Sequence, residues 1–181
     1  MNYLTIYFSM KGQTIAPGMQ IVNLEKGHTA VVAETIRQAV GGDLFAIETV
    51  RPYEEDHMKM IYQAKEELEQ GIRPALKTIP ATLEPYDVIF LCYPNWWNTL
   101  PMPVLAFLEQ LEWNGKRILP VNTSEGGGAG QSVAKIREIC TGAVIDPVYE
   151  LIGSQVDSSL PAIEAWAKEA VVGKQKKEET S

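Results

Sequence analysis

Hydrophobic residues follow two alternating kinds of pattern along the chain. Short apolar runs bounded by turn residues are typical of buried strands, and the clearest of them are residues 3–8 and 88–93. Three further runs are shorter or are interrupted by Pro120 or Pro147, which makes them weaker strand candidates: residues 44–50, 117–122 and 143–149. The pattern therefore predicts five strands.

Amphipathic helical patterns occupy the segments between these runs. In residues 29–40, Val32, Ile36 and Val40 share one face, and residues 54–70 show the same arrangement with charges opposite. The spacing of apolar positions also predicts helices over residues 103–111, 132–140 and 160–171. Each of these helices can cover one face of a sheet.

Alternating strands and helices predict an α/β fold. Because the strand runs are apolar on both faces, we expect a parallel sheet wrapped by helices on both sides. Right-handed crossovers then favour a doubly wound five-stranded parallel sheet with the order 2-1-3-4-5. In such a sheet, ligands bind beyond the carboxyl ends of strands 1 and 3, where the winding reverses. The loops after residues 8, 93 and 122 are therefore the places to search for a site.

Composition limits the class of protein. A chain of 181 residues with 45% hydrophobic and 22% charged residues is ordinary for one globular domain. We expect that domain over residues 1–173, with residues 10–25 as an inserted loop, followed by a polar tail at 174–181. A net charge of -7 would repel nucleic acid. No apolar run approaches membrane-spanning length and no basic leader precedes the first strand, so we expect a cytoplasmic protein with no membrane contact.

The cysteines and histidines indicate neither a disulfide nor a metal site. Cys92 lies inside an apolar run and Cys140 at the end of a helical pattern, so we expect two buried free thiols. His57 follows three acidic residues, 54–56, which is compatible with metal binding. Acidic residues are also favoured in the first turn of a helix, and we prefer that explanation.

Two segments after the first strand compete as a phosphate-binding loop, residues 9–14 and residues 26–29. A phosphate site needs hydroxyls, a glycine that permits close approach, and free amides at a helix N-terminus. Thr29 leads directly into a helix, whereas Thr14 is followed by residues 15–18, which break one. The alternative is that Thr29 only caps its helix. We predict a phosphate site formed by Ser9, Gly27, His28 and Thr29.

The loop after the third strand carries adjacent tryptophans, Trp96 and Trp97, and is closed by prolines. Indoles on loops usually cover either a core or a planar ligand. Composition alone favours a core role, but the loop leaves the sheet beside the predicted phosphate site. That position favours a flat aromatic ring attached to a phosphate.

The loop after the fourth strand has four glycines in five positions just before a helix, residues 126–130. Such a stretch brings backbone amides and carbonyls against a ligand without interference from side chains. A flexible connector is the alternative explanation. Residues 128–130 do not form a dinucleotide fingerprint, because that motif belongs in the first strand-to-helix turn and needs a third spaced glycine.

Over residues 3–148 the chain resembles the flavodoxin family, in particular bacterial flavodoxin-like proteins whose third loop reads Tyr-Pro-x-Trp-Trp-Gly. Residues 93–97 carry the most specific part of the resemblance. The resemblance implies flavin mononucleotide (FMN), with its phosphate at the four residues named above. It also implies an isoalloxazine ring between two loops that supply Pro94, Asn95, Trp96 and Trp97 on one side and Thr123, Ser124, Gly126, Gly127 and Gly128 on the other.

Three features depart from the family pattern. His28 stands where the family usually has asparagine, but it can still donate a hydrogen bond to phosphate. Asn98 stands where glycine is common, and asparagine tolerates a left-handed backbone better than most residues do. The first loop is split by the insertion at residues 10–25, which could move Ser9 away from the helix.

The resemblance implies an electron-transfer protein with no catalytic side chain of its own, because the redox chemistry belongs to the flavin. The alternative is an FMN-dependent oxidoreductase that takes hydride from NAD(P)H and reduces a quinone or similar small acceptor. The partners are accordingly redox proteins or a small electron acceptor. An acidic chain is expected to associate with basic protein partners at a salt-dependent rate.

Overall fold

The computed structural model describes residues 1–172 and shows an α/β fold built on one mainly parallel sheet. The sheet has the order β4-β1-β5-β6, and both β7 and β8 pair in parallel with β6 at its far edge. The predicted order 2-1-3-4-5 is thus confirmed. The strands are β1 (Tyr3–Tyr7), β4 (Asp43–Ala46), β5 (Val88–Pro94), β6 (Arg117–Ser124), β7 (Val144–Ile145) and β8 (Tyr149–Ile152).

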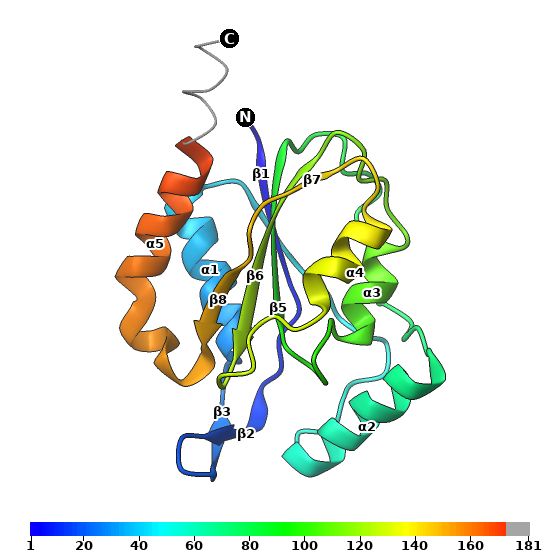
Figure 1. The fold of residues 1–181 in the computed structure, drawn as a ribbon, viewed down its shortest axis with the longest axis vertical. Helices are drawn as coiled ribbons and strands as arrows, with labels where there is room; N and C mark the ends of the chain where they lie inside the picture. Colours follow the sequence, from blue (N-terminus) through cyan, green and yellow to red (C-terminus); the bar gives the residue numbers. More distant parts are fainter. Residues whose placement is uncertain (173–181) are drawn as a thin grey trace.

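Helices cover both faces of the sheet (Figure 1). On one face lie α1 (His28–Val40) and α5 (Val156–Val172), and on the other lie α3 (Met102–Leu108) and α4 (Ser132–Ile139). A short 3-10 helix, η1 (Gly153–Gln155), leads into α5. The remaining helix, α2 (His57–Gln70), lies beyond the carboxyl ends of the strands (Figure 1).

The central strand β5 divides the core into two halves. Side chains of a strand alternate between its faces, and β5 is apolar at nearly every position. Val88, Phe90 and Cys92 pack with the helix pair α1 and α5. The alternate residues of the strand, Ile89 among them, pack with α3 and α4. A strand that buries both faces needs helices on both, which is why the sequence reads as an uninterrupted apolar run.

The fifth position of the sheet is occupied by two short strands, whereas one strand was predicted over residues 143–149. Pro147 has no N–H to donate to the ladder, and pairing with β6 stops at Ile145 and resumes at Tyr149. The Asp146 carboxylate forms an ion pair with Arg117, the first residue of β6. The strand is therefore broken at Pro147, whereas the Asp146 amide still donates to the Ile118 oxygen of β6.

The insertion at residues 10–25, predicted as a loop, forms a two-stranded antiparallel hairpin of β2 (Gly12–Ala16) and β3 (Gln20–Leu24). Its turn contains Gly18 and Met19, both with positive φ. The hairpin lies beyond the strand ends, on the same edge of the sheet as α2 (Figure 1).

The sequence also led to predictions about the cysteines, the last helix and the C-terminal tail. Cys92 and Cys140 are both buried and free, as predicted, and burial raises the pKa of the Cys140 thiol to about 12. The last helix was predicted over residues 160–171, but α5 begins four residues earlier, at Val156. Pro161 therefore lies inside the helix. No helix among residues 1–172 is long and apolar enough to cross a membrane. The expected tail, 174–181, lies outside the described residues.

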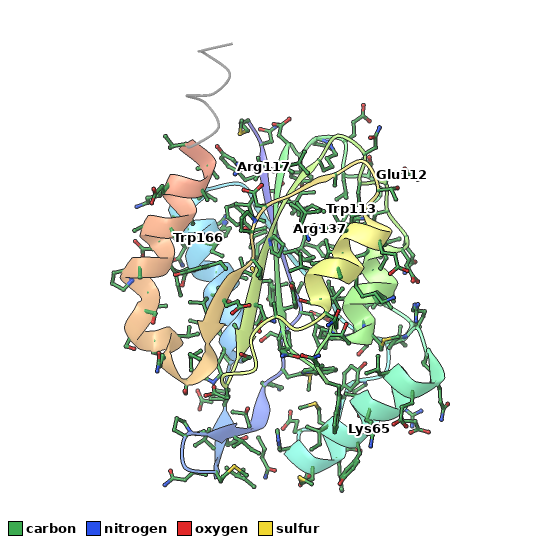
Figure 2. The ribbon with its side chains drawn as sticks, viewed as in Figure 1. Lys65, Glu112, Trp113, Arg117, Arg137 and Trp166 are labelled. Atoms are coloured by element: carbon green, nitrogen blue, oxygen red, sulfur yellow. The ribbon has the colours of Figure 1, made fainter. Side chains whose placement is uncertain are left out.

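The ion pair at the strand break gives a test of this architecture. Arg117 donates to both carboxylate oxygens of Asp146 and to the backbone oxygen of Ala170, and its side chain is only 11% exposed. Asp146→Ala leaves that guanidinium partly buried without its anion, so we expect unfolding in urea to show a loss of about 1–3 kcal/mol. Glu112→Ala, at an exposed loop position, is the control and should change stability by less than about 0.5 kcal/mol. Figure 2 labels Glu112 and Arg117, the partner of Asp146 in the ion pair. Equal effects of the two substitutions would contradict this role of the ion pair.

Candidate functional site

The carboxyl ends of β1, β5 and β6 open into a cavity of about 370 Å³. Parallel pairing brings the strand ends to one edge, because Tyr7 is in register with Cys92 and Pro94 with Thr123. Nine of the residues predicted from the sequence line this cavity: Ser9, His28, Thr29, Pro94, Asn95, Trp96, Trp97, Thr123 and Ser124. The other four predicted residues, Gly27, Gly126, Gly127 and Gly128, lie in the loops behind or beside it.

The end of β1 sits directly against the N-terminus of α1. Ser9 Oγ accepts a hydrogen bond from the Ala30 amide at 3.0 Å, and Gly27 is the N-cap residue. A Cβ at Gly27 would lie 2.2 Å from both Ser9 Oγ and the Met10 oxygen, so this close approach requires glycine. The insertion therefore leaves and re-enters the sheet edge without separating Ser9 from the helix.

Thr29 joins the first loop to the end of β6. Its hydroxyl lies 2.8 Å from the Thr123 hydroxyl, and both residues are buried. The competing threonine, Thr14, reaches the same cavity from β2 but belongs to a strand. The two segments that compete in the sequence thus face one cavity, and only the second of them opens a helix.

The tryptophan loop is a tight two-residue turn. Trp96 and Thr99 exchange backbone hydrogen bonds of 3.1 and 3.2 Å, and the two residues between them, Trp97 and Asn98, have φ of 53° and 64°. Two positive φ values in succession define a type I′ turn, in which asparagine and glycine are favoured. Asn98 therefore adopts the left-handed backbone that this turn requires. Its backbone oxygen also accepts from the Gln131 amide.

The two tryptophans have different surroundings. Trp96 packs its ring edge-on against Phe8 and Tyr53, with both centroid distances at 5.1 Å, so it covers the core as well as lining the cavity. Trp97 is 44% exposed, and its indole N–H donates to the Ile61 oxygen of α2 at 2.8 Å. The ammonium of Lys65 lies 5.4 Å from the centre of the Trp97 ring. Trp97 is therefore positioned by α2.

The glycine-rich loop is held by hydrogen bonds at several points. Ser124 Oγ accepts from the Gly128 amide, and Asn95 Nδ2 donates to the Gly128 oxygen at 2.6 Å. Glu150 accepts from the Ala129 amide. Asn95 Oδ1 is buried with no hydrogen-bond partner among residues 1–172. The loop has a defined shape, and one polar atom beside the cavity is left without a donor.

Comparison with known proteins identifies the family. The sequence profile of the family described as Flavodoxin matches residues 3–169. The chain belongs to the flavodoxin family. No curated protein sequence matches this flavodoxin.

Solved structures share the fold over nearly their whole length. A Bacteroides eggerthii DSM 20697 protein assigned as a flavoprotein is 27% identical, with 90% of this chain and 97% of that chain covered and a TM-score of 0.67. A Bacteroides uniformis ATCC 8492 protein of the same assignment is 24% identical, with 92% and 97% covered and a TM-score of 0.72. A Lactobacillus acidophilus NCFM flavoprotein solved in complex with FMN is 17% identical, with 87% and 97% covered and a TM-score of 0.60.

Ten residues that line the flavodoxin's cavity were not among the predicted site residues. These lining residues come from the insertion at residues 10–25, from α2, from the loop after β6 and from η1: Met10, Gln13, Thr14, Leu24, His57, Met60, Ile61, Ala64, Glu125 and Gly153. Ala64 is the one buried residue of α2 in the described structure, so this helix packs little against the core. Both histidines of the chain line the cavity. Among residues 1–172, no three His, Cys, Asp or Glu side chains gather closely enough to hold a metal ion.

A partly buried pair ties α2 to the core beneath Trp96. The Tyr53 hydroxyl donates to Glu67 at 2.5 Å, and burial raises the pKa of the Glu67 carboxyl above its usual range. Burial, followed by the hydrogen bond to Glu67, also raises the pKa of Tyr53. The flavodoxin therefore carries a carboxyl group on α2 whose neutral form is favoured in the folded state.

This pair predicts a pH-dependent contribution to stability. A raised carboxyl pKa stabilises the fold most below the pKa of the unfolded chain, about 4.3, and that contribution is lost as pH rises through the folded value. We expect the melting temperature of the wild type, relative to Glu67→Gln, to fall as pH rises above the pKa of the unfolded carboxyl, about 4.3. Circular dichroism melts measure this difference. Glu69→Gln, exposed on the same helix, is the control, and a difference that stays constant with pH would contradict the assignment.

Proposed function

We propose that this flavodoxin binds FMN in the cavity at the carboxyl edge of its sheet and transfers electrons through it. The observation that carries the proposal is the meeting of hydroxyls and indoles around one cavity. Ser9 and Thr29 lie at the N-terminus of α1, and Pro94, Trp96 and Trp97 lie across from them on the loop after β5. Family membership and the FMN complex of the Lactobacillus protein support the choice of cofactor.

The residues of the cavity fit the two ends of FMN. A helix N-terminus with adjacent hydroxyls favours a phosphate, because the first amides of a helix have no partner within it and the dipole attracts anions. The volume of about 370 Å³ lies within the usual range of small-ligand sites, about 300–1,000 Å³. The unpartnered Asn95 Oδ1 beside the cavity suits a ligand that offers an N–H group. FMN supplies the redox chemistry when bound.

The chain's own groups would hold the cofactor and limit its exposure to water. In the proposed arrangement Ser9, Gly27, His28 and Thr29 surround the phosphate, and Trp96 and Trp97 shield the ring with Pro94 and Asn95. The ordered loop at Thr123, Ser124, Gly126, Gly127 and Gly128 offers backbone partners to the ring edge. The proposal includes a cytoplasmic location, where free buried thiols stay reduced.

A second function has specific support. The hairpin, which is an insertion in the fold, and α2 enclose one side of the cavity. An enclosing wall favours a small acceptor, as in an NAD(P)H-dependent oxidoreductase, over a large protein partner. Oxidation of NAD(P)H by FMN-loaded protein, with and without a quinone, distinguishes the two functions, because a carrier alone turns over slowly.

The phosphate assignment is tested with paired threonine substitutions. Thr29→Val removes the hydroxyl at the helix N-terminus, and we expect FMN affinity to fall by about 10-fold to 100-fold, since a hydrogen bond to a charged group contributes about 1.5–3 kcal/mol. Thr29→Ser should retain affinity, and Thr14→Val should reduce it less than Thr29→Val does. Quenching of flavin fluorescence measures all three affinities.

Riboflavin, which lacks the phosphate, is the matched ligand control. Its affinity should be equal in wild type and Thr29→Val. A larger effect of Thr14→Val would assign the phosphate to the hairpin, and a wild-type protein that takes up no FMN would refute the proposed function.

The tryptophans give an independent test of the ring position. Trp97→Ala removes a half-exposed indole, so we expect a folded protein with a shifted FMN absorption spectrum and weaker FMN binding by about tenfold, as for one stacked ring. Trp97→Phe should restore part of the affinity. An unchanged spectrum and affinity in Trp97→Ala would leave Trp96 as the aromatic contact.

A further inference from the structure

The hairpin and the N-terminal end of α2 contact each other beside the cavity that both segments line. The Gln13 amide donates to the Glu55 oxygen at 2.9 Å, and Gln13 Oε1 accepts from the His57 amide at 3.2 Å. A Cβ at Gly12 would lie 2.9 Å from Glu55 Cβ, so the two segments touch closely. Both segments lie beyond the strand ends in Figure 1. The insertion is therefore a fixed wall of the cavity.

This wall differs in chemistry from the end at α1. The side chains that the hairpin and α2 contribute to the cavity are mainly apolar, among them Leu24, Met60, Ile61 and Ala64. The α1 end, in contrast, is formed by hydroxyls and by the imidazole of His28. Apolar walls bind flat hydrocarbon surfaces, and methionine adapts its shape to a ligand more readily than branched residues do. The cavity therefore has a polar end and an apolar compartment.

The apolar compartment contains a polar group without a partner. His57 lines the cavity, and its Nδ1 is buried without a hydrogen bond among residues 1–172. A buried polar atom in this state is costly, by about 1–3 kcal/mol. Rotation of the ring toward a bound carbonyl or hydroxyl group would satisfy it. Gln13 and Thr14 lie on the same wall and offer further polar contacts.

We propose that this hairpin–α2 compartment is a binding site for a small, flat, mostly apolar molecule that carries a carbonyl or hydroxyl group. The molecule contacts Leu24 and Met60 with its apolar surface and His57 with its polar group. This inference rests on the proposed function in one respect, since it assigns the polar end of the cavity to FMN and the apolar end to a second ligand.

The experiment uses duroquinone (tetramethyl-1,4-benzoquinone) as the probe, because it is flat, apolar and substituted at every ring carbon. Oxidised FMN-loaded protein is titrated without a reductant, and the imidazole signals are followed by NMR. The chain has two histidines, so His57→Gln assigns both signals. We expect saturable binding that shifts the His57 signal and leaves the His28 signal nearly unchanged.

Two substitutions on one strand provide matched controls. Leu24→Asp places a charge in the apolar wall and should weaken duroquinone binding by at least about tenfold, with FMN affinity changed less than about twofold. Ile21→Asp is the control, because Ile21 lies on the same strand but is 60% exposed and outside the cavity lining. His57→Ala should weaken the probe by about fivefold through loss of one hydrogen bond.

The outcomes separate this inference from the proposed function. A titration of cofactor-free protein is run in parallel, and a His57 shift there supports the compartment even if the protein takes up no FMN. Absence of saturable binding in both forms would overturn the inference. An equal loss of FMN and duroquinone affinity in Leu24→Asp would overturn it as well, because the compartment would then hold the flavin ring.

Discussion

The parallel register of β1, β5 and β6 is the constraint on which the site depends. Ladder hydrogen bonds fix these strands relative to one another, so the segments that follow Tyr7, Pro94 and Thr123 must leave the sheet at one edge. The Asn95 amide continues this ladder by donating to the Thr123 oxygen. Residues more than a hundred positions apart in the chain are thereby brought to opposite sides of one cavity. Buried apolar side chains on both faces of β5 hold that register in place.

A second constraint is the close approach between the first loop and α1. Because Gly27 has no side chain, the backbone after β1 can lie directly on the helix N-terminus, and Ser9 can bond to the Ala30 amide. The hairpin is tolerated at this place because an insertion in a loop costs little when its ends stay together. Hydrogen bonds to Glu55 and His57, from another part of the chain, hold the hairpin in place. The insertion thus adds a wall without disturbing the polar end of the cavity.

Two carboxylates near the site, Glu125 and Glu150, have structural roles. Glu150 accepts from the Ala129 amide and Glu125 accepts from both the amide and the hydroxyl of Ser154, so carboxylates hold the loop after β6 and the start of η1. Glu125 also lines the cavity. Negative charge here would disfavour the anionic reduced form of a flavin ring, and the net charge of -7 favours basic partners over acidic ones.

Much of the fold and most of the polar end of the site followed from local patterns. Apolar periodicity determined the strands and helices, because alternation of period two or 3.6 reflects burial within a single element. The sequence also determined that Ser9, Thr29, Trp96 and Thr123 follow strands or open helices, and strand order then brought them together.

Tertiary structure alone decided the hairpin wall, the separate surroundings of Trp96 and Trp97, and the position of His57. Each of these depends on contacts between segments distant in the chain, such as Glu55 with Gln13 and Ile61 with Trp97. Local periodicity records how an element faces its core and contains no information about which distant residue will meet it.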